Sequence, residues 1–104
     1  MNPSILAIIS EPNRFKIVEY LLSGSESVNQ ISDKLHMTQP QTSKHLRVLA
    51  DYGVVDVKID AQKRIYSLNL DKFEVIDAWL GQFRTLWEDR LNRLGEHLKE
   101  VKNK

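Results

Sequence analysis

A helix is predicted to begin in the segment Thr38-Gln39-Pro40-Gln41-Thr42-Ser43-Lys44-His45-Leu46-Arg47-Val48-Leu49. Thr38 is a favoured N-cap residue, and Gln41 follows three residues later, so the pair predicts a capping box. Pro40 is tolerated there because the amides of a first helical turn have no intrahelical partner. Helical spacing places four residues on one side, facing a core: Thr42, His45, Leu46 and Leu49.

The other side of this predicted helix carries no carboxylate. It presents two amides, one hydroxyl and two cations: Gln39, Gln41, Ser43, Lys44 and Arg47. Amides pair with adenine edges, Arg and Lys pair with guanine edges or phosphates, and hydroxyls pair with either. The same composition also suits an ordinary solvated helix surface, so the flanking sequence has to decide between the two interpretations.

The preceding segment predicts a second helix that ends close to the first. Ser27 and Gln30 form another capping box, and only His36 and Met37 separate the end of that helix from Thr38. Two helices joined by so short a turn, the second polar and basic outside, are typical of a helix-turn-helix, here over about residues 27–52. His36 stands where such turns usually have Gly, and His is among the residues that tolerate positive φ.

A β-hairpin is predicted directly after the helix-turn-helix. Val55, Val57 and Ile59 alternate with polar residues, as in a half-buried strand, and a second strand returns at residues 65–68. The polar tip between them carries Lys63 and Arg64. The hairpin, over about residues 54–69, is interpreted as a wing whose basic tip suits phosphate or minor-groove contact.

The last element is predicted to be a long helix over about residues 71–98, opened by a capping pair of Asp71 and Glu74. Such a helix is about 40 Å long, which is more than a small domain can cover. We interpret it as a dimerisation helix, with the short apolar helix that Asn2 caps at the N-terminus alongside. The alternative is that it folds back on its own domain. The expected interface residues are Ile5, Ile9, Phe73, Ile76, Trp79, Leu80, Phe83 and Trp87.

Composition sets the limits of these interpretations. The 104 residues are 41% apolar and 28% charged, as in one ordinary globular domain spanning residues 1–104. Without cysteine, disulfides and thiolate metal sites are excluded. No apolar run approaches the ~20 residues of a membrane span, and Met1-Asn2-Pro3-Ser4 lacks the features of a signal peptide. A cytoplasmic protein is therefore expected.

The net charge of the chain is +1, and the positive excess lies in residues 34–66, around the predicted DNA-facing helix.

The order of elements resembles the ArsR family of bacterial winged helix-turn-helix repressors. Glu11-Pro12-Asn13-Arg14-Phe15-Lys16-Ile17 resembles the family run D-P-T-R-R-x-I, and residues 39–49 resemble Q-P-x-V-S-x-H-L-x-x-L. Gly53-Val54-Val55 and Arg64-Ile65-Tyr66-Ser67-Leu68 are similar to its G-L-V and R-x-Y-x-L strands, and residues 79–88 are similar to a subgroup ending in W-L-x-x-F-R-x-x-W-E. The departures are Ser32 for Ala, His36 for Gly, Thr42 for Val and a wing tip without Gly.

The resemblance implies a mainly α fold with a small β-hairpin (α+β), a winged helix-turn-helix with a long C-terminal dimerisation helix. It further implies a homodimer that binds an imperfect inverted repeat at an operator. DNA contacts carried over from the family fall on Gln39, Gln41, Thr42, Ser43 and Lys44, and phosphate or wing contacts on Thr38, Arg47, Lys63 and Arg64.

Many members of that family sense metals, but their ligand sets are missing from this sequence. Glu26-Ser27-Val28-Asn29 replaces the cysteine pair, and Asp71-Lys72-Phe73 lacks the His of the other common site, whose later positions hold Arg84 and Trp87. His97 and Glu100 form an i, i+3 pair, but two ligands make a poor site unless a symmetry mate adds more. No metal and no cofactor are expected.

The leading hypothesis is a dimeric, metal-independent transcriptional repressor whose partners are double-stranded DNA and a second copy of itself. An unidentified small organic effector, or protein level alone, would regulate it. The alternative is a winged-helix protein-interaction module that docks a partner on its long helix and has lost DNA binding. An enzyme is not expected, because the sequence has no phosphate-binding Gly-rich loop, no nucleophile beside a base and no carboxylate pair on an apolar face.

Overall fold

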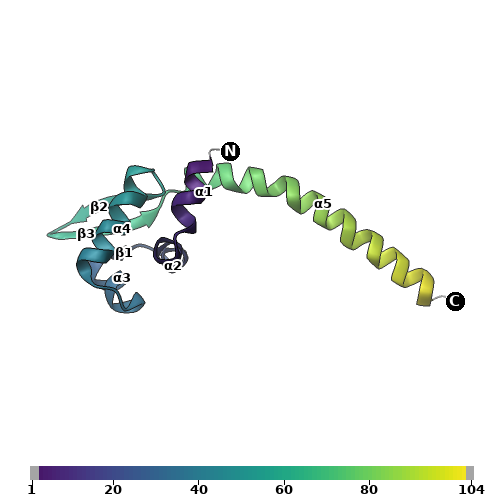
Figure 1. The fold of residues 1–104 in the computed structure, drawn as a ribbon, viewed down its shortest axis with the longest axis horizontal. Helices are drawn as coiled ribbons and strands as arrows, with labels where there is room; N and C mark the ends of the chain where they lie inside the picture. The colour runs from purple at the N-terminus through teal and green to yellow at the C-terminus, as the bar shows by residue number, and fades with distance from the viewer. Residues whose placement is uncertain (1–2, 103–104) are drawn as a thin grey trace. The chain divides into compact units, whose positions relative to one another are not determined.

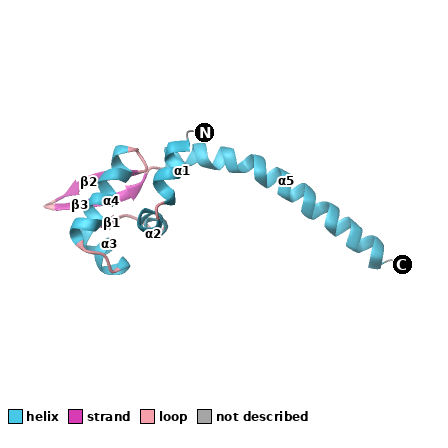
Figure 2. Ribbon diagram, viewed as in Figure 1, coloured by secondary structure: helices cyan, strands magenta, loops and turns pink. Residues whose placement is uncertain are grey.

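A computed structural model describes the backbone of residues 3–102 and the side chains of residues 5–95. The body comprises the chain up to Phe73, and α5 from Glu74 onward forms a second compact unit. A lone helix has no hydrophobic core of its own, so α5 does not form a separate domain by itself. The organisation of residues 1–104 as a single domain stays a prediction. The elements, labelled in Figure 1 and coloured by type in Figure 2, are α1 (Pro3–Ser10), α2 (Pro12–Leu21), β1 (Glu26–Ser27), α3 (Val28–Leu35), α4 (Gln39–Asp51), β2 (Val55–Asp60), β3 (Lys63–Leu68) and α5 (Leu70–Lys102).

The capping boxes predicted at Ser27 and Thr38 are present. The hydroxyl of Ser27 accepts a hydrogen bond from the backbone N–H of Gln30 at 3.2 Å, and the Gln30 side-chain oxygen accepts from the Ser27 N–H at 2.9 Å. Thr38 and Gln41 make the same exchange at the start of α4. His36 between the two helices is left-handed, with φ of 56° and ψ of 44°. The helix-turn-helix prediction is confirmed, including the substitution of His for Gly.

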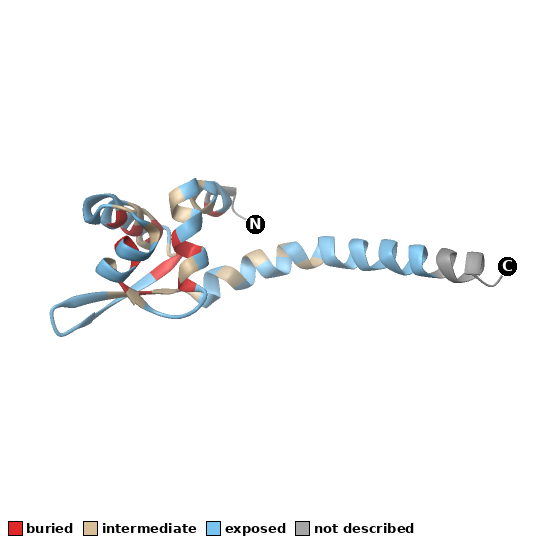
Figure 3. Cartoon of the chain, turned by 90° about the horizontal axis from the view of Figure 1, so that it is seen from below, coloured by how far each residue is buried: buried red, intermediate tan, exposed pale blue. Residues whose placement is uncertain are grey.

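The core lies where α2, α3, α4 and the base of the hairpin meet. Five apolar side chains there are fully buried: Ile17, Ile31, Leu46, Leu49 and Val54. Each contributes about 1.5–3 kcal/mol relative to an exposed position. Figure 3 shows the hairpin tip and most of the described part of α5 as exposed, and Ile5 of α1 is buried together with the residues of this core.

The three strands form an antiparallel sheet in the order β1-β3-β2. Asp60 pairs with Lys63, which leaves Ala61 and Gln62 as a two-residue turn with Ala61 at φ 58°. The expected half-buried alternation along β2 is correct only at its base. Val55 is 2% exposed, but Val57 and Ile59 are 49% and 71% exposed, because the hairpin extends past the core.

The long helix differs at both ends from the prediction of residues 71–98. It begins at Leu70 and continues to Lys102. Its first turn is capped by Asn69, whose side-chain oxygen accepts a hydrogen bond from the Asp71 N–H at 3.1 Å. The prediction of a cap at Asp71 was therefore wrong, because Asp71 already lies inside the first turn.

The N-terminal helix corrects one expected interface residue. Ile5 is 7% exposed, so its side chain is already covered within the chain and is not free to pack against another subunit. Ile9 on the same helix is half-buried. The expected cap at Asn2 lies outside the described residues. None of the helices described is both long and apolar enough to cross a membrane.

Candidate nucleic-acid interface

The outer face of α4 is exposed and polar, as predicted. Gln39, Gln41, Ser43, Lys44 and Arg47 are all exposed. Their orientation is fixed from behind, where the same helix inserts Thr42, Leu46 and Leu49 into the core. The face therefore carries amide, hydroxyl and cationic groups on a rigid support.

A groove of about 500 Å³ separates this face from the wing. Ser43, Lys44 and Arg47 line it from α4, and Arg64 and Tyr66 line it from β3. Three of these side chains are cationic and one further lining residue, Asp51, is acidic, so the groove has a net positive charge that attracts an anion. Its dimensions and charge suit a nucleic-acid backbone lying along α4.

A second groove, of about 340 Å³, lies between the starts of α3 and α4 and the tip of the wing. It brings together four residues that the sequence predicted as DNA contacts: Gln39, Ser43, Lys63 and Arg64. Asn29 and Gln62 also line it, and sequence reasoning missed both. Asn29 lies at the start of a helix and Gln62 at the tip of the hairpin, each close to a predicted DNA contact. This position is the feature of the sequence that could have identified them.

The amides of Gln39 and Gln41 present different atoms to solvent. The side-chain nitrogen of Gln39 donates a hydrogen bond to the Asn29 side-chain oxygen. The side-chain oxygen of Gln41 instead accepts from the Thr38 backbone N–H at 3.3 Å and from the Thr38 hydroxyl at 3.2 Å. The side-chain oxygen of Gln39 thus remains available to accept a hydrogen bond, whereas the side-chain nitrogen of Gln41 remains available to donate one.

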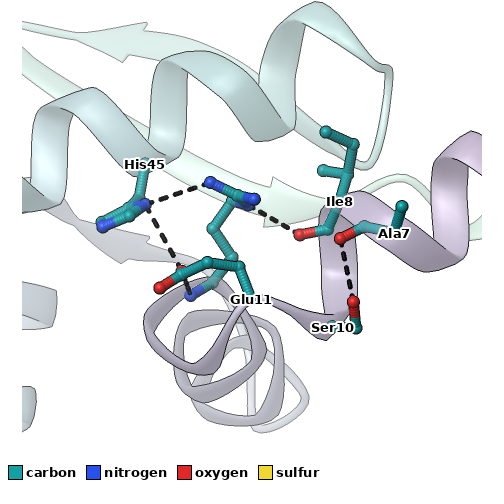
Figure 4. A network of polar contacts seen from close by, with 6 residues as sticks. Ala7, Ile8, Ser10, Glu11 and His45 are labelled. Carbon is teal, nitrogen blue, oxygen red and sulfur yellow. Dashed lines mark hydrogen bonds and ion pairs between the residues drawn. The ribbon is translucent and has the colours of Figure 1, made fainter.

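A polar network ties α4 to the first two helices (Figure 4). The half-buried His45 ring lies 3.6 Å from the Glu11 carboxylate and 3.5 Å from the Arg14 guanidinium, both measured from Nδ1. Arg14 also donates from Nε to the carbonyl of Ile8 at 2.6 Å. The network joins the end of α1 and the start of α2 to the middle of α4, and so holds α4 in place.

The pKa of Glu11 is lowered from its ordinary value within this network. The main cause is the backbone N–H of Arg14, which donates to the carboxylate at 2.9 Å. The backbone N–H of Asn13 and the charges of His45 and Arg14 act in the same direction, whereas burial opposes them. Glu11 is also the N-cap of α2, so its charged form stabilises a helix start.

Comparison with known proteins assigns the chain to a protein family. Residues 11–57 match the family model described as "Bacterial regulatory protein, arsR family". A solved structure of a possible transcriptional regulator for arsenical resistance is 32% identical, with a TM-score of 0.66 over 86% of this chain and 90% of that one. This chain belongs to the ArsR family. Like its ArsR relatives, it is a winged-helix transcriptional regulator and not an enzyme.

Two ArsR-family relatives differ in how much of their length is matched. The arsenical resistance operon repressor of Staphylococcus xylosus is 27% identical over 82 residues, which is 79% of each chain. The biofilm growth-associated repressor of Agrobacterium fabrum (strain C58 / ATCC 33970) is 34% identical over 68 residues. This chain spans only 58% of that second repressor.

Two departures from the ArsR pattern form one buried hydrogen bond. The Ser32 hydroxyl donates to Thr42 Oγ1 at 2.9 Å, and Thr42 Oγ1 donates in turn to the carbonyl of Thr38 at 2.9 Å. Thr42 is 0% exposed. The prediction that Thr42 contacts DNA was therefore wrong, because its hydroxyl is enclosed between α3 and α4.

Within the described part of this ArsR-family chain, no three His, Asp or Glu side chains lie close enough together to hold a metal ion. The side chains of the expected pair, His97 and Glu100, lie outside the described residues.

Proposed function

We propose that this transcriptional repressor of the ArsR family binds an inverted-repeat operator as a homodimer, works in the cytoplasm and requires no metal ion. The observation that carries the proposal is the carboxylate-free outer face of α4 from Gln39 to Arg47, bordered by two grooves to which the wing contributes Lys63 and Arg64. Amides, a hydroxyl and cations on one rigid helix suit the major groove, which admits a helix and displays a distinct donor and acceptor pattern for each base pair.

Two kinds of contact make different contributions to DNA binding. Lys44, Arg47, Lys63 and Arg64 neutralise phosphates, which gives affinity that falls as salt rises and does not depend on sequence. Gln39, Gln41 and Ser43 read base edges, which gives sequence preference. Thr38, the exposed N-cap of α4, is a further proposed phosphate contact.

The dimer is supported by the apolar side chains that α5 leaves exposed. Leu80, Phe83 and Trp87 are exposed on α5, and Trp79 packs edge-to-face on Phe83 with ring centroids 5.0 Å apart. Phe73 and Ile76, nearer the start of the helix, are half-buried. Uncovered aromatic and aliphatic side chains at helical spacing favour burial against another helix, and a second copy of the chain would supply it.

Selection of bound sequences from a random duplex pool tests the proposal. We expect enrichment of an inverted repeat whose half-site centres lie about 10–10.5 base pairs apart, or a multiple of that distance. Absence of enrichment in dilute salt, from a protein that sediments as a single subunit, would overturn it in favour of a protein-interaction module.

Zinc tests metal independence separately. We expect neither the melting temperature nor the operator affinity to change when zinc is added in modest excess or when a chelator is present. A clear shift of either quantity would contradict the absence of a metal requirement, because a metal that binds only the folded protein stabilises it.

A further inference from the structure

We propose that Asn29, at the start of α3, is a positioning residue for base recognition that acts through Gln39. The inference rests on the proposed function, because it concerns how the operator is read. Asn29 lies in α3, outside α4, and its side-chain oxygen accepts a hydrogen bond from the side-chain nitrogen of Gln39. The two side chains line the same groove as Lys63 and Arg64.

The hydrogen bond fixes the direction of the Gln39 amide. An amide that is free to rotate presents its oxygen and its nitrogen to a base with similar ease. With one N–H of Gln39 directed at Asn29, the oxygen points away from α3 and the second N–H stays free. An acceptor beside a donor matches the N6 and N7 edge of adenine in the major groove.

Within the first turn of α3, Asn29 is the residue whose side chain can accept a hydrogen bond from Gln39. Val28 is apolar, and the side-chain oxygen of Gln30 is occupied by the backbone N–H of Ser27 at 2.9 Å. The Gln41 amide is held in the same way by Thr38, at the start of α4. Gln39 is therefore the amide on this face whose acceptor is turned outward, and Asn29 is the residue that turns it.

Pre-organisation of this kind improves discrimination by lowering the cost of ordering Gln39 when DNA binds. It adds no contact with the duplex. Loss of Asn29 should therefore affect one base pair in each half-site and leave the dependence of affinity on salt unchanged, because that dependence counts the phosphates contacted.

The decisive experiment is a double-mutant cycle on the operator obtained by selection, measured against every single base-pair change in one half-site. Gln39→Ala should flatten discrimination at one A·T pair. Asn29→Ala should reduce discrimination at the same pair by about three- to tenfold, a part of the value of one bidentate contact. The double variant should lose no more than Gln39→Ala alone. Additive losses, or losses spread over all positions, would overturn the proposal.

Two further variants separate positioning from a general structural role. Asn29→Asp keeps the acceptor for Gln39 but adds a negative charge, so discrimination at that pair should be retained while affinity for all sequences falls. Gln62→Ala removes an amide from the same groove and should leave discrimination at that pair unchanged. If Asn29→Asp loses discrimination as fully as Asn29→Ala, the acceptor is not what matters and the proposal fails.

Side-chain amide NMR of the free protein examines the hydrogen bond without DNA. Asn29→Ala should shift the Gln39 side-chain signals and lower their order parameter, whereas Gln62→Ala should not. Unchanged Gln39 signals in Asn29→Ala would overturn the inference alone. If the wild-type protein enriches no sequence from a random pool, the proposed function fails and the inference falls with it.

Discussion

Ser32 and Thr42, two departures from the ArsR pattern, show how a single buried hydroxyl affects the stability of this fold. Thr42→Val keeps the shape of the side chain but leaves the buried Ser32 hydroxyl without its acceptor. We expect a loss of about 1–3 kcal/mol in the free energy of unfolding, the cost of an unsatisfied buried polar group. Ser32→Ala should cost less, because Thr42 still donates to the carbonyl of Thr38.

Urea denaturation of the two single variants and of Ser32→Ala/Thr42→Val measures this coupling. The double variant should recover most of the stability lost in Thr42→Val, because it contains no unpaired hydroxyl. Additive losses in the double variant would mean that the two hydroxyls do not depend on each other.

The carboxylate of Glu11 makes stability depend on pH. Its pKa is lowered in the folded protein, chiefly by the backbone N–H of Arg14. A lowered folded pKa gives stability that is present above the ordinary pKa of 4.5 and is lost as the pH falls through the folded value. We therefore expect Glu11→Gln to be less stable than wild type near neutral pH and the difference to shrink in acid.

Chemical denaturation at a series of pH values checks this. Glu19→Gln is the matched control, since it removes one carboxylate from an exposed position on the same helix. A difference between wild type and Glu11→Gln that stays constant from neutral to acidic pH would contradict the role given to this carboxylate.

Among the structural elements, α4 and the wing are expected to affect DNA binding in different ways. Arg64 lines both grooves from β3, and its guanidinium suits a phosphate. Arg64→Ala should weaken binding to all duplexes alike and reduce the slope of log affinity against log salt by about 1. Gln41→Ala should instead relax sequence preference with little change in that slope.

Binding measured at several salt concentrations, on the selected operator and on unrelated duplexes, distinguishes the two effects. Lys58→Ala is a suitable control for Arg64→Ala, because Lys58 is an exposed cation of the same hairpin that lines neither groove. Equal losses across all duplexes for both Arg64→Ala and Gln41→Ala would contradict the division of work between these elements.

The elements also show where sequence reasoning succeeds and where it stops. The capping boxes at Ser27 and Thr38 are local, so spacing alone predicted the starts of α3 and α4. Exposure along β2 depends on where the core ends, and alternation could not reveal that Ile59 lies beyond it. The contact between Asn29 and Gln39 joins residues ten positions apart through the turn, so no pattern within a single helix predicts it.

At the scale of the whole molecule, the proposal depends on α5 pairing with a second copy. Trp87 is 58% exposed on the apolar side of α5, and its neighbours Phe83 and Leu91 are exposed with it. Trp87→Glu would place a charge in the middle of that contact. Loss of a buried Trp costs about 3–5 kcal/mol, and about 1.4 kcal/mol corresponds to a factor of ten. The dissociation constant of the dimer should therefore rise at least about a hundredfold.

Sedimentation equilibrium measures that constant, and circular dichroism verifies that α5 is still helical. Asp89→Lys is the matched control, because two residues along a helix place it on the opposite side from Trp87, and it should leave the dimer intact. A dimer that survives Trp87→Glu would exclude this face as the contact. With the dimer lost, affinity for the inverted repeat should fall towards that for a single half-site, because only a dimer holds two α4 helices at the spacing of successive major grooves.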